Sequence, residues 1–237
     1  MKRNIISLLG PIAIAGLVNA GPQDLNILTQ KEKAEGWRLL FNGTSFHGWR
    51  GYRMPGMPKT GWIIEDGLLK TVAKATGREL ITVQKFNDFE LSWEWKISKG
   101  GNNGVKYFVT EERPEAPGHE YQMIDDKPQG ELKIRAKQAT ASFYDVLPPA
   151  DNLPLQPAGE WNQSRILVQG NRVEHWLNGK KALEYELGSE RVKAGLAESK
   201  FNKYPDFGTK IQGHIMLTYH NDECWYRNIK IRELPAK

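Results

Sequence analysis

The chain has 237 residues, with 33 Lys and Arg against 28 Asp and Glu, and its formal net charge at pH 7 is +5. The basic residues are scattered among acidic ones instead of forming a stripe, which argues against a nucleic-acid partner. A lone cysteine, Cys224, excludes an internal disulfide, and the length suits one β-sandwich or barrel domain whose core needs no such staple.

The first 20 residues have the pattern of a secretory signal peptide. Lys2 and Arg3 form a short basic region, residues 5–18 form an apolar run, and a possible cleavage site follows at Ala20. The run contains glycine and proline and is too short for a comfortable membrane span. The sequence therefore predicts export to the periplasm or beyond, a mature domain over residues 21–237, and no integral membrane association after signal removal.

The mature chain opens with one helical signal and continues with β signals. Thr29 predicts the start of a short helix over residues 29–35, because Glu32 stands three residues on as in a capping box. Asp66-Gly67 predicts a tight hairpin between two short apolar runs. The strands expected in this half are residues 37–41, 62–65, 68–71, 79–84 and 88–98.

The last of these strands alternates most regularly, with Phe89, Trp93 and Trp95 on one face and Glu90 and Glu94 on the other. A strand with so much apolar surface is expected to pack against a second sheet. Aromatic residues near turns, Trp49 and Trp62, are the tryptophans that could instead stack on a sugar ring.

Residues 100–126 combine a glycine-rich turn with two strand-like stretches that carry polar groups. In the second stretch Glu120 and Gln122 share one face, whereas Tyr121 and Met123 share the other. Lys106 stands in the first stretch and is a natural partner for Glu120. A polar sheet face is costly to bury without a ligand, so this stretch predicts a ligand-binding surface.

The rest of the chain also reads as short strands separated by Gly, Asn and Asp turns. The strands expected there are residues 139–146, 163–169, 172–177, 213–219 and 225–233, with a helical turn at 189–194 and a loop at 200–210. Many short strands without a long amphipathic helix indicate an all-β fold, a sandwich of two antiparallel sheets. Cys224 is expected to be an ordinary strand residue.

None of the common zinc-protease, serine-hydrolase or nucleotide-binding motifs occurs in the chain. Several segments instead match the motifs of a known family, namely residues 40–44, 48–49, 66–69, 102–108, 120–122, 125–126, 142–145, 159–162, 173–179, 199–200 and 227–231. By these segments the chain resembles the 3-keto-disaccharide hydrolase domain family, and the resemblance covers nearly the whole mature chain in the right order.

The resemblance implies a concanavalin-like jelly-roll sandwich that acts on sugars oxidised at C3. A ketone at C3 acidifies the proton at C2, so a base can remove that proton and the C1 substituent can leave by elimination, after which water adds back. Such a site needs a base near C2, an acid at the leaving oxygen, and donors or a metal for the developing enolate.

The expected catalytic residues are Glu120, His220, Asp125 and Lys106. Glu120 would serve as base or acid and Lys106 would steady the enolate, whereas His220 matches the family's histidine near the end of a late strand. The expected substrate-binding residues are Gln122, Asn103, His175 and Lys137, with Lys200 as a further candidate. Arg227 and Asn228 are expected to brace the last strand.

Carboxylates and imidazoles together leave a divalent metal possible, although their spacing matches no recognised ligand pattern. The chain departs from the family at Thr218 and Tyr219, where Gln and Asp are usual, and after Asp126, where a polar loop residue is missing. A non-catalytic carbohydrate-binding module on the same sandwich is therefore an alternative. An ordinary glycosidase is a further alternative, which would need a second carboxylate facing Glu120.

Overall fold

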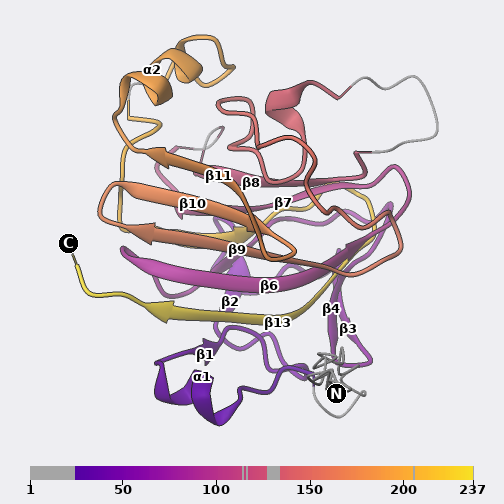
Figure 1. Ribbon diagram of the computed structural model, residues 1–237. Coiled ribbons are helices and arrows are strands. Elements are labelled where there is room, and N and C mark those ends of the chain that lie inside the picture. Colours follow the sequence, from indigo (N-terminus) through magenta and orange to yellow (C-terminus); the bar gives the residue numbers. More distant parts are fainter. Residues whose placement is uncertain (1–24, 114, 116, 127–133, 205, 237) are drawn as a thin grey trace, which may run out of the picture.

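A computed structural model describes residues 25–113, 115, 117–126, 134–204 and 206–236 (Figure 1). The predicted signal peptide lies outside these residues. Within the described ranges, no helix combines the length and the hydropathy needed to cross a bilayer.

Two antiparallel sheets form the molecule, as the sequence predicts. Sheet A has the strand order β11-β10-β9-β6-β13-β4-β3, with β1 paired to β13, and sheet B has the order β2-β5-β12-β7-β8. The strands of sheet A are β1 (Arg38–Leu39), β3 (Trp62–Glu65), β4 (Leu68–Thr71), β6 (Phe89–Ile97), β9 (Asn162–Gln169), β10 (Arg172–Leu177), β11 (Lys180–Glu186) and β13 (Cys224–Glu233). Those of sheet B are β2 (Trp49–Gly51), β5 (Leu80–Thr82), β7 (Asn102–Val109), β8 (His119–Ile124) and β12 (His214–Leu217).

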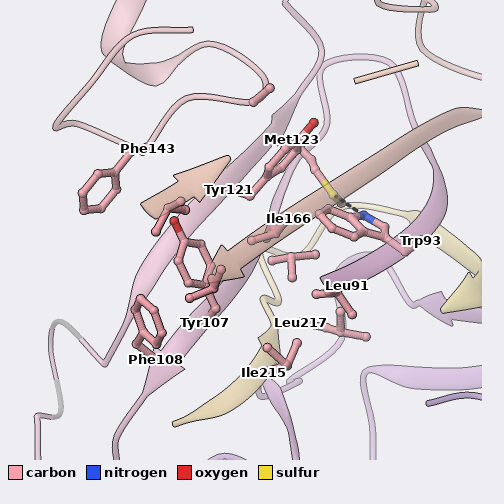
Figure 2. Close-up of a cluster of buried hydrophobic side chains, with 14 of the residues drawn as sticks. Leu91, Trp93, Tyr107, Phe108, Tyr121, Met123, Phe143, Ile166, Ile215 and Leu217 are labelled. Atoms are coloured by element: carbon pink, nitrogen blue, oxygen red, sulfur yellow. Dashed lines mark hydrogen bonds between the residues drawn. The ribbon is translucent and has the colours of Figure 1, made fainter. Parts of the chain in front are cut away.

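The inner faces of the two sheets meet in an aromatic core (Figure 2). Trp93 of β6 packs edge-on against Tyr121 of β8, with ring centroids 5.0 Å apart, and its Nε1–H lies 3.3 Å from the sulfur of Met123. Each of these side chains is at most 1% exposed. Burying one large apolar side chain stabilises the fold by about 1.5–3 kcal/mol. A strand that slipped by one residue would turn these side chains outward, so their burial holds both sheets in register.

The short helices and the hairpin that local sequence patterns predict are present in the structure. Helix α1 (Gln30–Ala34) begins at Thr29 with the predicted capping box to Glu32. The β3–β4 hairpin turns at Asp66 and Gly67, whose φ angles of 51° and 75° suit a type I′ turn. Helix α2 (Glu190–Ala197) is capped by Ser189, and Figure 1 shows it beyond the edge strand β11.

The strand predicted at residues 139–146 is wrong. A short 3-10 helix (Ala136–Gln138) precedes a series of turns, and Ala141 and Asp145 have φ angles of 68° and 62° that a regular strand does not contain. Isolated bridges join Phe143 to Tyr121 and to Leu147. The segment therefore lies along the free edge of β8 without becoming a full strand.

Trp49 and Trp62 are not sugar platforms. They are 5% and 7% exposed, and their indole N–H groups donate to the carbonyl oxygens of Leu40 at 2.6 Å and Arg78 at 2.7 Å. Cys224 is a buried residue of β13, as predicted, and burial raises the pKa of its thiol to about 12.

Candidate functional site

The candidate site lies on the outer face of sheet B, where β7 and β8 run side by side. The register pairs Lys106 with Glu120 and Gly104 with Gln122. Directly opposed residues point to the same face, and Tyr121 points into the core, so these four residues lie on the outer face. The structure thus brings together three of the predicted site residues: Glu120, Lys106 and Gln122.

Glu120 owes its position to a glycine in the neighbouring strand. A Cβ atom added to Gly104 would lie 2.4 Å from Glu120 Oε1, so the carboxylate leans across β7 into space that another residue would fill. Its Oε2 atom is 3.5 Å from Lys106 Nζ, and the residue is 7% exposed. The result is a largely buried carboxylate beside an ammonium group.

The segment that was expected to be a strand adds a further column of side chains. Because Phe143 bridges to Tyr121, Tyr144 lies opposite Glu120 and Ser142 opposite Gln122. The Tyr144 N–H donates to the Glu120 carbonyl oxygen at 3.0 Å, and Lys200 Nζ lies 4.5 Å from the centre of the Tyr144 ring. Burial, followed by the nearby charge of Glu120, raises the pKa of the Tyr144 phenol.

Two predicted site residues, Asp125 and Asn103, have structural partners elsewhere. The Asp125 carboxylate accepts the Gly100 N–H at 2.9 Å, so it holds the glycine turn before β7. Asn103 points into the core, where its Oδ1 accepts hydrogen bonds from Thr218 at 2.7 Å and Tyr226 at 3.1 Å. The structure therefore does not bring either side chain to Glu120.

His175 is also in the core, fully buried between the sheets. Its Nδ1–H donates to the Ala141 carbonyl at 3.0 Å and its Nε2 accepts from the Tyr107 hydroxyl at 2.9 Å, while Tyr185 donates to Tyr107 in turn. Burial lowers the pKa of the His175 imidazole to about 4. This network fixes the segment that carries Tyr144, and it keeps His175 off the outer face.

The remaining predicted residues lie at the rim. Lys137 forms an ion pair with Glu198 at 2.7 Å. His220 is exposed, two residues after Thr218, whose N–H donates to the Gly104 carbonyl oxygen at 3.0 Å. The backbone thus leads His220 to the Gly104 end of the site, and its exposed imidazole can meet a ligand there.

A pocket of about 390 Å³ opens beyond the end of β8. It is lined by the polar residues Asp126, Thr140, Asp151 and Asn152 together with small and aliphatic residues. Burial raises the pKa of the Asp126 carboxyl to about 6, although the Thr140 N–H donates to it at 2.9 Å. The pocket adjoins the segment that carries Ser142 and Tyr144.

Within the described ranges, no cluster of three or more His, Cys, Asp or Glu residues is arranged to hold a metal ion. Binding of a divalent metal therefore stays a prediction, which experiment has to test.

Tyr144 and Ser142 are the site residues that sequence reasoning missed. The signal was the alternation of Ser142 and Tyr144 with the apolar Ala141 and Phe143, which places the two polar residues on one face. That alternation predicts a strand, but it does not predict that the strand lies beside the polar face of β7 and β8. Arg227 and Asn228, in contrast, brace β13 as predicted, since both donate to Glu94 of β6.

An antiparallel sandwich with a carboxylate, an ammonium group and an amide on one sheet face is an arrangement suited to binding sugars. Residues 36–232 match the 3-keto-alpha-glucoside-1,2-lyase-like domain family, and the chain belongs to that family. It is a carbohydrate-active enzyme by this membership, as the sequence predicts.

Individual relatives agree with the family assignment. The chain is 34% identical over 232 residues to a 3-keto-disaccharide hydrolase of Bacteroides thetaiotaomicron, an alignment that covers 85% of this chain and 79% of the relative. A crystal structure from Parabacteroides distasonis, described as a "putative glycosyl hydrolase", has a TM-score of 0.79 at 36% identity and covers 89% of this chain and all of that one. A second such structure from the same organism has a TM-score of 0.68 at 24% identity, covers 84% and 99% of the two chains, and supports the fold.

Proposed function

We propose that this enzyme cleaves 3-keto-glycosides at C1 by removing the proton at C2. The observation that supports the proposal most directly is the Glu120–Lys106 pair on the outer face of sheet B, a buried carboxylate 3.5 Å from an ammonium group. Family membership and the 3-keto-disaccharide hydrolase relative support the proposed substrate class.

In the proposed reaction the Glu120 carboxylate takes the C2 proton. The electron pair of the C2–H bond forms the enolate, whose negative charge on the C3 oxygen is stabilised by the Lys106 ammonium group. When the C3 carbonyl re-forms, a C1–C2 double bond forms and the C1–O bond breaks. Water then adds its oxygen to C1 and a proton to C2, which completes a net hydrolysis.

The leaving oxygen needs a proton, and we propose that Tyr144 supplies it. Its phenol stays protonated at neutral pH because burial and the charge of Glu120 raise its pKa. Lys200 above its ring supports negative charge on the phenolate after the transfer. His220 at the rim is the second candidate for the same role.

An ordinary glycosidase mechanism would need a carboxylate facing Glu120 across the scissile bond. Among the described residues, those opposite or beside Glu120 on this face are Tyr144, Lys106 and Gln122. This set suits enolate chemistry better than the paired carboxylates of retaining and inverting enzymes.

The test is release of a chromogenic aglycone from a 3-keto-glucoside, run beside its unoxidised parent, with EDTA and with added divalent metal. Turnover of the keto compound alone supports the proposal, and the EDTA arm decides whether a metal takes part. Turnover of neither compound, together with measurable sugar binding, would contradict it and favour a carbohydrate-binding module.

We also propose that the mature enzyme is exported and begins near Gly21, on the basis of the sequence pattern of residues 1–20. N-terminal sequencing of the protein from the periplasm or culture medium tests this. An intact Met1 on the mature protein would refute it.

A further inference from the structure

Two buried polar atoms on the outer face of sheet B have no hydrogen-bond partner among the residues that the structure describes. They are Oε1 of Gln122 and Oγ of Ser142, on residues that are 2% and 0% exposed. The other end of the Gln122 amide is satisfied, since Nε2 donates to Asn102 Oδ1 at 3.1 Å. Leaving a buried polar atom unpaired destabilises the folded protein, so each atom indicates a missing partner.

The two atoms belong to directly opposed residues. The bridge between Tyr121 and Phe143 places Ser142 across from Gln122, and backbone hydrogen bonds run from Ala141 N–H to the Gln122 carbonyl at 2.9 Å and from Gln122 N–H to the Ser142 carbonyl at 3.5 Å. Ala141 and Phe143 pack into the core, so Ser142 shares the outer face with Gln122.

The chemistry of the two atoms is complementary. An amide oxygen only accepts hydrogen bonds, whereas a serine hydroxyl can donate one. A single hydroxyl group between them can accept from Ser142 and donate to Gln122, which pairs both atoms at once. A ketone or an ether oxygen can accept from Ser142 but cannot donate to Gln122.

The distance from the proposed base fits a single sugar ring. Glu120 leans over Gly104, and Gly104 is the register partner of Gln122. Opposed residues on antiparallel strands are about 4.5–5.5 Å apart, which is close to the width of a pyranose. A ring whose C2 proton meets Glu120 therefore has its other hydroxyls within reach of Gln122.

We propose that Ser142 and Gln122 form a subsite for one free hydroxyl of the sugar ring held at Glu120. The identity of that sugar as a 3-keto-glycoside rests on the proposed function, whereas the hydroxyl subsite itself rests on the two unpaired atoms. Ser142 and Gln122 are then specificity-determining residues that reject sugars lacking this hydroxyl.

The experiment measures sugar affinity in the absence of turnover. In the Glu120→Gln background, calorimetry gives the Kd of methyl 3-keto-glucoside and of its 2-, 4- and 6-monodeoxy analogues, and the unoxidised series is measured in parallel. Ser142→Ala and, separately, Gln122→Met are then added, and Ser92→Ala on the outer face of sheet A serves as the matched control. Ser92 is a buried serine, 6% exposed, on a strand remote from the site.

We expect each variant to weaken binding of the parent sugar about tenfold, as for one lost buried hydrogen bond. One deoxy analogue should bind to the Glu120→Gln protein about tenfold more weakly than the parent sugar does. When Ser142→Ala or Gln122→Met is added, that analogue and the parent sugar should bind with equal affinity. The Ser92→Ala control should keep the discrimination.

The subsite would be overturned if, for every analogue, the loss of affinity from the missing hydroxyl simply added to the loss from the substitution. Failure of every sugar to bind would also overturn it. An enclosed water would then be the partner of both atoms. The two proposals fail separately. If the wild-type protein cleaves no 3-keto-glycoside but the coupling between Ser142 and one hydroxyl persists, the subsite stands and the proposed reaction falls.

Discussion

The outer faces of the two sheets differ in how far the hydrogen-bonding groups of their charged and polar residues are paired within the protein. On sheet A, Glu90 accepts hydrogen bonds from Arg165 at 2.6 Å and Arg232 at 2.7 Å, and Glu94 accepts from Arg227 at 2.7 Å. These carboxylates are held in charge-assisted hydrogen bonds within the protein, so their partners are already in place.

On sheet B the polar groups are left with capacity for a ligand. Glu120 meets Lys106 at 3.5 Å, and within the described part of the chain Gln122 and Ser142 each retain an unpaired buried oxygen. From this difference we expect carboxylates on sheet A to contribute to stability and propose that Glu120 on sheet B contributes to function. Substitutions on the two faces should therefore separate the two properties.

The largest effect is expected for Glu120→Gln compared with Glu94→Gln. The first removes the proposed base and should lower kcat by about 10³-fold or more with sugar binding kept, because general acid–base catalysis contributes about 10²–10⁴-fold. The second should keep kcat within about twofold but lower the free energy of unfolding by about 1 kcal/mol through the weakened bonds to Arg227 and Asn228. Steady-state kinetics and urea unfolding measure both, and equal activity losses in the two variants would contradict the contrast.

Lys106→Met should lower kcat about 10²-fold, since the enolate loses its stabilising charge, as for loss of one oxyanion donor. Lys106→Arg keeps the charge and should recover part of the activity. The measurement is kcat on a chromogenic 3-keto-glucoside. Full activity in Lys106→Met would remove Lys106 from the mechanism.

Gly104→Ala is expected to lower kcat about tenfold with little change in stability. The added Cβ would approach Glu120 Oε1 to 2.4 Å, and the end of a flexible side chain can move aside, which displaces the carboxylate. Gly56→Ala is the matched control, because nothing lies within 4 Å of its added Cβ. If both variants retain wild-type kcat, the position of the carboxylate over β7 does not matter.

The last prediction concerns how the stability of the core depends on pH. The pKa of His175 is lowered to about 4 by burial, whereas an unfolded imidazole has its ordinary value near 6.5. Between these values the unfolded chain binds a proton that the native protein does not, so stability is present above pH 6.5 and is lost as the pH falls toward 4. His175→Gln keeps a donor and an acceptor and should reduce the slope of unfolding free energy against pH by about 1.4 kcal/mol per unit in this window.

Urea unfolding at several pH values between 4 and 7 gives that slope. An identical slope in the wild-type and His175→Gln proteins would show that His175 already carries its proton in the native state.

The sequence predicted what depends on local pattern. Alternation placed Glu120 and Gln122 on one face, and the capping box at Thr29 and the turn at Asp66-Gly67 defined their elements. These features are decided within a few neighbouring residues, which is why a single sequence suffices.

What the sequence did not predict depends on contacts between distant segments. The strand expected at 139–146 is broken by left-handed residues, and only its bridge to β8 brings Tyr144 to Glu120. His175 is drawn inward by a hydrogen-bonded network from two other strands. Asn103 could have been assigned to the core, because it shares its alternation with Val105 and Tyr107.

The central claim is that cleavage proceeds through removal of the C2 proton at Glu120. The most direct test is to run the reaction in D₂O and examine the 3-keto sugar product by NMR at early times, beside a sample without enzyme. The account predicts deuterium at C2 of the product above the non-enzymatic level, with Glu120→Gln inactive in both cleavage and exchange. A product that retains its original C2 proton would contradict it, because direct displacement at C1 would then be the reaction.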